Sequence, residues 1–125
     1  MNLKQLHWTV VGDGFRPVHE QMDEIYSIAD EASDEVAERM AQLNLVPDGR
    51  PTTVGDNCTH DEFGLSSVLY CDAVDMAHSL VAEVCDIIRP YAMSCDDVVT
   101  QNMLTDILTD LEKQMWMLRV QTVEE

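Results

Sequence analysis

Glycines and prolines divide the chain into four helix-like segments, and no strand-like alternation of apolar and polar residues lies between them. The segments cover residues 2–11, 17–43, 65–91 and 94–123. The second segment opens with Pro17, which suits a first helical position, and stops at Asn44 and Pro47. Pro90 is expected to close the third segment. The pattern predicts an all-α protein.

Four segments of this kind predict a four-helix bundle in a single domain spanning residues 1–125. The polar connection between the second and third helices is expected to hold a loop or a short helix around residues 59–63. The first segment is unusually short, whereas the helices of a bundle normally match in length. Either residues precede Met1 in the natural chain, or the first helix is shortened.

The charge of the chain limits its partners. There are 7 Lys and Arg residues against 24 Asp and Glu residues, which gives a net charge of −17, and the basic residues are spread along the chain. Such a surface repels nucleic acid and anionic membranes and attracts cations. The 4 cysteines show no CxxC spacing, so reduced thiols in a cytoplasmic protein are expected. No apolar run approaches the ~18 residues of a membrane helix.

The second segment carries two stripes of side chains when it is wound as a helix. The apolar stripe predicts the core face and consists of Met22, Ile25, Ala29, Ala32, Val36, Met40 and Leu43. The polar stripe on the opposite side consists of His19, Asp23, Asp30, Asp34 and Glu38. A stripe of acids is commonly a solvated face, so the spacing within it must decide between solvation and chemistry.

This spacing indicates that the polar stripe pairs with a second copy of itself. His19 and Glu38 lie about 28 Å apart along a straight helix, so one chain cannot bring both to a single ion. In two antiparallel helices related by a twofold axis, residues face each other when their numbers add to a constant. His19 with Glu38 gives one such sum, and Asp23 with Asp34 gives the same one. One dyad therefore aligns both pairs and creates two equivalent clusters.

His7 joins each cluster, because the glycine turn after the first segment brings that segment back along the second. His7, His19 and Asp23 of one chain then face Asp34 and Glu38 of the other. Two imidazoles with two or three carboxylates form a mixed nitrogen and oxygen ligand set, which suits Fe(II) and leaves positions open for an oxidant. A structural zinc site would more often use cysteine.

These residues closely resemble the ligand pattern of the Dps group of mini-ferritins. The matching stretches are His7-Trp8, "GDGFRPVHEQMDEIY", "DEVAER", "PDGRP" and "LEKQMWMLR", and together they extend over nearly the whole chain. The resemblance implies a ferritin-like four-helix subunit that assembles as a hollow dodecamer built from twofold dimers. It also implies an iron centre shared across each dimer interface.

The resemblance further implies an activity. Members of this family oxidise Fe(II), preferably with hydrogen peroxide, and store the ferric mineral in the cavity, which protects against oxidative stress. Carried over residue by residue, the ligands and catalytic residues of this ferroxidase centre are His7, His19, Asp23, Asp34 and Glu38. Trp8 matches the aromatic residue that shields the centre or supplies electrons. Iron held beside peroxide supplies the two electrons that peroxide needs.

Two alternative functions stay open. Family members that bind DNA usually do so through a Lys/Arg-rich terminus, whereas this sequence has only Lys4 near its start and ends "VQTVEE". DNA binding is therefore not expected, and a nucleoid-associated protein is the weaker hypothesis. The other alternative is a catalytically inactive helical shell. For the aspartate-lined threefold opening that admits iron in the family, the candidates are Asp97, Asp106 and Asp110.

Overall fold

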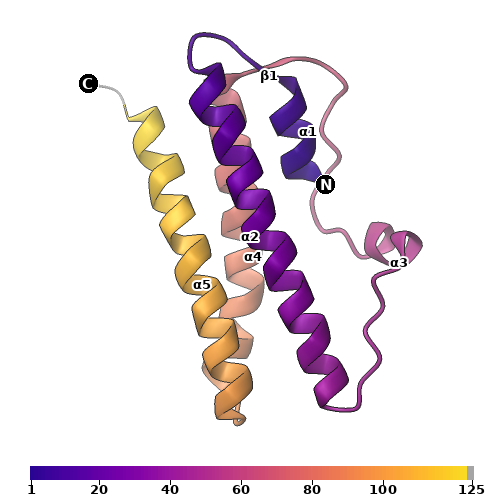
Figure 1. The fold of residues 1–125 in the computed structure, drawn as a ribbon. Helices are drawn as coiled ribbons and strands as arrows, with labels where there is room; N and C mark the ends of the chain where they lie inside the picture. Colours follow the sequence, from indigo (N-terminus) through magenta and orange to yellow (C-terminus); the bar gives the residue numbers. More distant parts are fainter. Residues whose placement is uncertain (124–125) are drawn as a thin grey trace.

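The computed structural model describes residues 1–123, and in it three long helices lie side by side with a short first helix packed along one of them (Figure 1). The elements are α1 (Asn2–Thr9), β1 (Val10–Val11), α2 (Phe15–Gln42), α3 (Pro51–Asp56), β2 (Val68–Leu69), α4 (Tyr70–Ser94), α5 (Val98–Arg119) and the 3-10 helix η1 (Val120–Thr122). The all-α prediction and the short first helix are confirmed.

Residues at the two ends of α2 explain where the helix begins and stops. The helix begins at Phe15 and so includes Pro17 in its first turn, where a missing N–H costs little because these groups have no partner within the helix. At the other end Asn44 adopts a left-handed backbone with φ of 63°. The N–H of the next residue, Leu45, then bonds the carbonyl of Met40 at 2.9 Å. Asn44 therefore stops the helix, as predicted.

The third long helix differs from its expected bounds. α4 starts at Tyr70 and runs through Pro90 to Ser94, so the prediction that Pro90 closes the helix was wrong. Ala92, beyond the proline, is buried in the core, and the Pro90 carbonyl accepts a hydrogen bond from the Ser94 hydroxyl at 2.9 Å. Packing against α5 outweighs the one backbone bond that proline cannot make.

The connection between α2 and α4 also corrects the sequence analysis. Its short helix is α3, which has Pro51 in the first turn, and residues 59–63 are not helical. The short helix was predicted in the wrong place because Pro51 was read as a helix breaker, whereas it begins α3. Two short parallel strands were not anticipated: Val10 pairs with Val68, and Val11 pairs with Leu69. They join this connection to the turn between α1 and α2.

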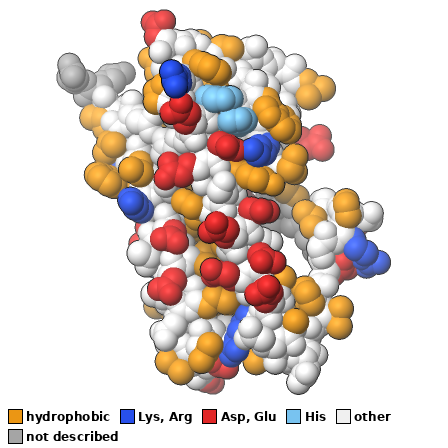
Figure 2. All heavy atoms as spheres, viewed as in Figure 1, with side chains coloured by type: hydrophobic (Ala, Val, Ile, Leu, Met, Phe, Trp, Pro, Cys, Tyr) orange, Lys and Arg blue, Asp and Glu red, His pale blue; other side chains and the backbone are white. Residues whose placement is uncertain are grey.

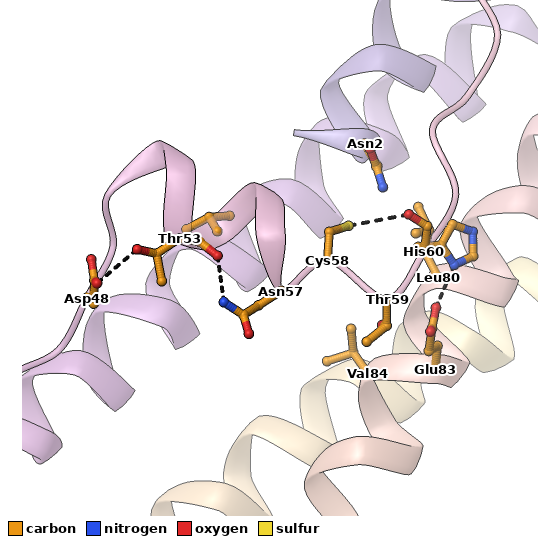
Figure 3. A pocket seen from close by; sticks show the side chains of 11 residues that line it. Asn2, Asp48, Thr53, Asn57, Cys58, Thr59, His60, Leu80, Glu83 and Val84 are labelled. Carbon is orange, nitrogen blue, oxygen red and sulfur yellow. Dashed lines mark hydrogen bonds and ion pairs between the residues drawn. The ribbon is translucent and has the colours of Figure 1, made fainter.

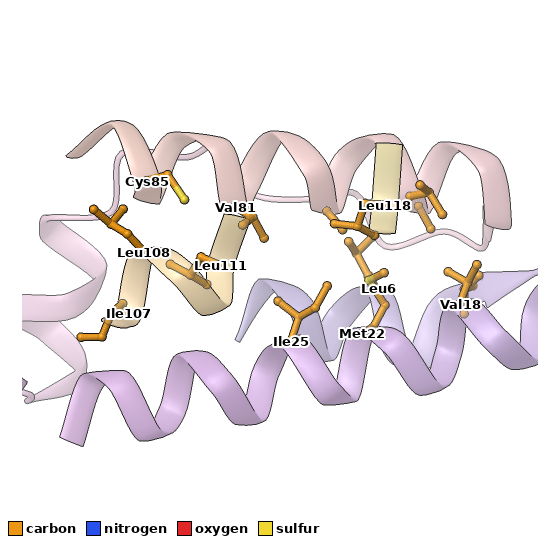
Figure 4. Close-up of a cluster of buried hydrophobic side chains, with 14 of the residues drawn as sticks. Leu6, Val18, Met22, Ile25, Val81, Cys85, Ile107, Leu108, Leu111 and Leu118 are labelled. Atoms are coloured by element: carbon orange, nitrogen blue, oxygen red, sulfur yellow. The ribbon is translucent and has the colours of Figure 1, made fainter. Parts of the chain in front are cut away.

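The core lies among α1, α2, α4 and α5, where Leu6, Met22, Ile25 and Leu118 are completely buried (Figure 4). The predicted core face of α2 is confirmed at Met22 and Ile25 and is half-buried at Ala32, Val36 and Met40. It is wrong at Ala29 and Leu43, which are exposed. The reason is the length of α1, which lies beside only the first half of α2 and leaves the second half without a fourth helix over it (Figure 1).

Carboxylates dominate one face of the molecule, where α2 and α5 lie at the surface (Figure 2). The exposed acids in the middle and second half of α2 are Asp30, Glu31, Asp34, Glu35 and Glu38. These acids give α2 a strongly negative outer side, which attracts cations. None of the described helices combines the length and the apolar character needed to cross a membrane.

Candidate metal centre

His7 and His19 lie face to face where α1 packs against α2. Their ring centroids are 3.7 Å apart, with 14° between the ring planes. The Nδ1 atom of His7 lies 2.7 Å from the backbone carbonyl oxygen of His19, and the Nδ1 atom of His19 lies 2.6 Å from that of His7. A carbonyl oxygen can only accept, so each Nδ1 carries the hydrogen and donates it. In the neutral rings the free lone pair is therefore on Nε2, ready to bind a metal.

A tight turn brings the two histidines together. Gly12 has φ of +107°, a conformation that L side chains rarely adopt, and it begins the turn that leads into α2. The ring of Tyr70, the first residue of α4, packs against this turn so closely that a Cβ atom on Gly14 would overlap it. Sequence reasoning missed Tyr70. The two glycines signal a close approach, but they do not reveal which residue approaches.

Asp23 lies one helical turn after His19 and shares a hollow of about 470 Å³ with the histidines. The residues that line this hollow are His7, His19, Glu20, Asp23, Glu24 and Ser27. Lys4 of α1 forms an ion pair with Asp23, and the hydrogen bond from Lys4 holds the pKa of Asp23 below its ordinary value. The sequence analysis did not assign Lys4 to the site. Its position one turn before His7 was the available signal.

Asp34 and Glu38 are exposed farther along α2. Because α2 is one unbroken helix, Glu38 lies about 28 Å from His19 within a chain. Across residues 1–123, no group of three or more His, Cys, Asp or Glu side chains is placed to hold a metal ion. His7, His19 and Asp23 line one hollow but do not form a complete metal site by themselves, and Asp34 and Glu38 do not line that hollow. Their meeting across a dimer stays a prediction.

Trp8 follows His7 on α1, and 62% of its surface is exposed. Successive helical residues point about 100° apart, so Trp8 lies beside the histidine pair without stacking on it. In a single chain this large apolar side chain faces solvent. Its role as a shield or electron donor for the centre stays a prediction.

A second hollow, of about 560 Å³, lies between α3 with its flanking loops and α4 (Figure 3). His60 in this hollow bonds through Nδ1 to the Glu83 carboxylate at 2.5 Å, and this hydrogen bond holds the pKa of Glu83 below its ordinary value. The Cys58 thiol donates to the His60 carbonyl at 3.4 Å. These polar groups satisfy one another, so this hollow offers no ready ligand set.

The three aspartates considered for an iron opening have different surroundings. Asp97 accepts hydrogen bonds from the backbone N–H groups of Val99 and Thr100 as the cap of α5, and it pairs with Arg39 at 2.9 Å. Asp106 and Asp110 are exposed on α5. Asp97 therefore has a structural role within the chain, and the lining of an opening stays a prediction for all three.

Comparison with known proteins agrees with the observed fold. Residues 1–124 match the ferritin-like domain family, so the bundle is of the ferritin-like class and that prediction is confirmed. A DNA protection during starvation protein of Mycolicibacterium smegmatis is 32% identical over 123 residues, which are 95% of this chain and 66% of that protein. The corresponding protein of Brevibacillus brevis is 30% identical over 125 residues, 94% of this chain and 80% of that protein.

A solved structure of a Dps has the same fold as this chain. The Dps of Microbacterium arborescens in its high-iron form superposes with a TM-score of 0.93 at 26% identity, over 98% of this chain and 82% of that one. The chain belongs to the Dps family, as the sequence resemblance implied. It spans just under two thirds of the length of the Mycolicibacterium relative.

Proposed function

We propose that this protein oxidises Fe(II), preferably with hydrogen peroxide, and stores the ferric product inside a hollow homo-oligomer, a dodecamer built from twofold dimers. The main support is the anchored pair of His7 and His19 beside Asp23. The spacing of Asp34 and Glu38 in the sequence, which a twofold dimer would bring to this pair, adds to it. Membership of the Dps family and similarity to a Dps in its high-iron form add support. The four free thiols fit the cytoplasmic location that we propose.

In the proposed dimer, two α2 helices run antiparallel, and Fe(II) binds as the substrate between them. His7 and His19 offer their Nε2 lone pairs, because hydrogen bonds to carbonyl oxygens hold both Nδ1 atoms. Asp23 offers a carboxylate from the same chain. Asp34 and Glu38 of the partner subunit offer two more. The carboxylates offset the charge of the iron, and the imidazoles set the directions in which it is bound.

The reaction balances with two iron ions for each peroxide. Each Fe(II) gives up one electron, the two electrons break the O–O bond, and two protons convert the oxygens into two water molecules. The iron leaves the centre as Fe(III) and enters the mineral. Trp8, next to His7, is proposed to shield the centre or to supply an electron when only one iron is bound.

The relatives are named for the protection of DNA, and we propose that this chain protects by removing iron and peroxide rather than by covering DNA. The net charge of −17 supports this view, since association with a polyanion depends on clustered basic residues. The seven basic residues are instead spread along the sequence.

The test of this function is stopped-flow oxidation of Fe(II) by peroxide. We expect the double replacement of His7→Ala with His19→Ala to abolish rapid oxidation, whereas His78→Ala, a half-buried histidine on α4, leaves the rate unchanged. Size-exclusion chromatography checks that all three proteins assemble alike. If the double variant oxidised iron as fast as the unmodified protein, the assignment of the centre would be wrong. If the unmodified protein oxidised iron no faster than buffer without protein, an inactive shell would become the better description.

A further inference from the structure

We infer that Glu24 is a further carboxylate ligand at the metal centre, the one that first receives an incoming divalent cation, and that Gln114 is the positioning residue that holds it there. This inference rests on the proposed function. It adds one residue of α2 and one of α5 to the centre, and neither belongs to the ligand set carried over from the sequence.

Gln114 is the only polar side chain that is buried in the part of the chain that the structure describes, with 2% of its surface exposed. It reaches from α5 to α2, where its Oε1 atom accepts a hydrogen bond from Gln21 at 3.2 Å and its Nε2 atom donates to the Glu24 carboxylate at 3.4 Å. An ionised carboxylate can only accept, so the amide must turn its nitrogen towards Glu24. Both halves of the buried amide are therefore paired, which offsets the cost of burying it.

A third glutamine fixes this orientation. The Oε1 atom of Gln21 accepts a hydrogen bond from Gln121 at 2.5 Å, so the Nε2 atom of Gln21 is left to face Gln114. If the Gln114 amide turned over, its nitrogen would meet the nitrogen of Gln21 and its oxygen would meet the carboxylate of Glu24. The chain of amides thus holds one oxygen of Glu24 in place and leaves the other oxygen for a cation.

The charges around the hollow distinguish Glu24 from its neighbours. Glu24 lines the same hollow as the two histidines and Asp23. The other two carboxylates of this hollow have cationic partners within the chain, since Arg16 pairs with Glu20 and Lys4 pairs with Asp23. Glu24 takes part in none of the ion pairs found among residues 1–123, and the amide that holds it is neutral. A cation can therefore bind Glu24 without displacing an internal one.

Glu24 is also the carboxylate that a cation can reach from solvent. Its side chain is exposed, whereas Gln114 behind it is buried. Figure 2 shows carboxylates next to the two histidines, on the acidic face to which cations are attracted. Because Gln114 already fixes the position of Glu24, less side-chain freedom is lost when the cation binds. The cation then lies in the hollow that the Nε2 atoms of the histidines can supply with further ligands.

The test is the affinity of the assembled protein for Co(II), a divalent probe with visible absorption. Glu24→Gln keeps an oxygen that can accept from Gln114 but removes the charge, and we expect it to bind Co(II) about 10-fold more weakly. Glu35→Gln is the matched control. It removes the same charge from the same side of α2, three turns later, where the residue is exposed and does not line the hollow. Its affinity should equal that of the unmodified protein.

The role of Gln114 has its own test. Gln114→Met keeps the length and volume of the buried side chain but cannot donate to Glu24, so we expect the affinity for Co(II) to fall about 2- to 10-fold, the usual contribution of one hydrogen bond. In a Glu24→Ala background the same change should have no further effect on the affinity, because there is no carboxylate to hold. Gln114→Leu makes the same test if the methionine variant does not assemble.

Opposite results would overturn the inference. Equal affinities of Glu24→Gln and Glu35→Gln would mean that Glu24 adds nothing beyond its general charge. A loss from Gln114→Met that persisted in the Glu24→Ala background would show that Gln114 acts through the packing of α2 and α5. Failure of the proposed function looks different, because the unmodified protein and the double histidine variant would then bind Co(II) equally well. If those two differ and Glu24→Gln binds as tightly as the unmodified protein, only the role of Glu24 is lost.

Discussion

The rings of His7 and His19 stack at 3.7 Å, and each ring donates its Nδ1 hydrogen to the backbone carbonyl of the other residue. The acceptors are backbone atoms, so they remain when either side chain is replaced. We therefore expect His7→Ala to leave His19 in the same tautomer, and the converse. Nitrogen NMR of the single variants checks this, and a mixture of tautomers in the remaining ring would show that stacking, not the carbonyl, orients it.

A shared centre predicts complementation between two inactive variants. His19→Ala and Glu38→Gln each damage every centre of their own oligomer, but in a mixed dimer both changes fall in one centre and leave the other intact. After random reassembly of equal amounts, about one quarter of the original rate should return. Peroxide-driven oxidation of Fe(II) measures it. A site built within one chain would instead give no recovery, because both centres of each mixed dimer would carry a damaged residue.

The glycine turn predicts a stability effect. Gly14→Ala places a methyl group where the Tyr70 ring lies, so we expect the free energy of unfolding to fall by about 1–3 kcal/mol, as for other overpacked sites. Gly49→Ala is the matched control, because a Cβ atom there would meet nothing within 4 Å. Urea unfolding measures both variants. Equal stability of the two variants would show that Tyr70 moves aside freely.

From the surroundings of Asp97 we predict that the stability of the protein depends on pH. Its pKa is held below the ordinary value of 3.8, first by the hydrogen bond from the backbone of Thr100 and then by Val99 and Arg39. The folded state thus favours the charged form. This stabilisation is present above pH 3.8 and is lost as the pH falls through the lower pKa of the folded state.

Asp97→Ala should therefore lower Tm at pH 7, and the difference from the unmodified protein should disappear in acid. Asp96→Ala is the control, because it removes the same charge from the neighbouring exposed residue without removing the cap of α5. Calorimetry over a pH series measures the effect. A difference in Tm that stayed constant down to the lowest pH would contradict the charged cap.

The net charge predicts weak interaction with DNA. At about 50 mM salt, where electrostatic binding is strong, we expect the 125-residue chain to cause no retardation of duplex DNA in a gel. A variant with an added lysine-rich tail is the positive control, and it should retard DNA with an affinity that falls steeply with salt. Retardation by the unmodified chain would favour the nucleoid-associated alternative.

The sequence by itself determined the helical class and the ligand spacing. The helical spacing of apolar residues such as Met22 and Ile25 fixes which face of α2 is buried. The spacing of the polar residues predicts that the histidine end of one α2 helix faces the acidic end of another in an antiparallel pair. These features depend on positions along one helix, so local geometry is sufficient to read them. The same local chemistry identified Asn44 as the end of α2.

The tertiary structure alone decided which groups meet across helices. The reciprocal hydrogen bonds of His7 and His19, the contact of Tyr70 with the glycine turn and the Lys4–Asp23 pair each join different elements. The burial of Ala92 beyond Pro90 likewise depends on packing of α4. Such contacts depend on the relative rotation and depth of packed helices. Periodicity within one segment carries no information about them, because it is the same for every rotation of the neighbouring helix.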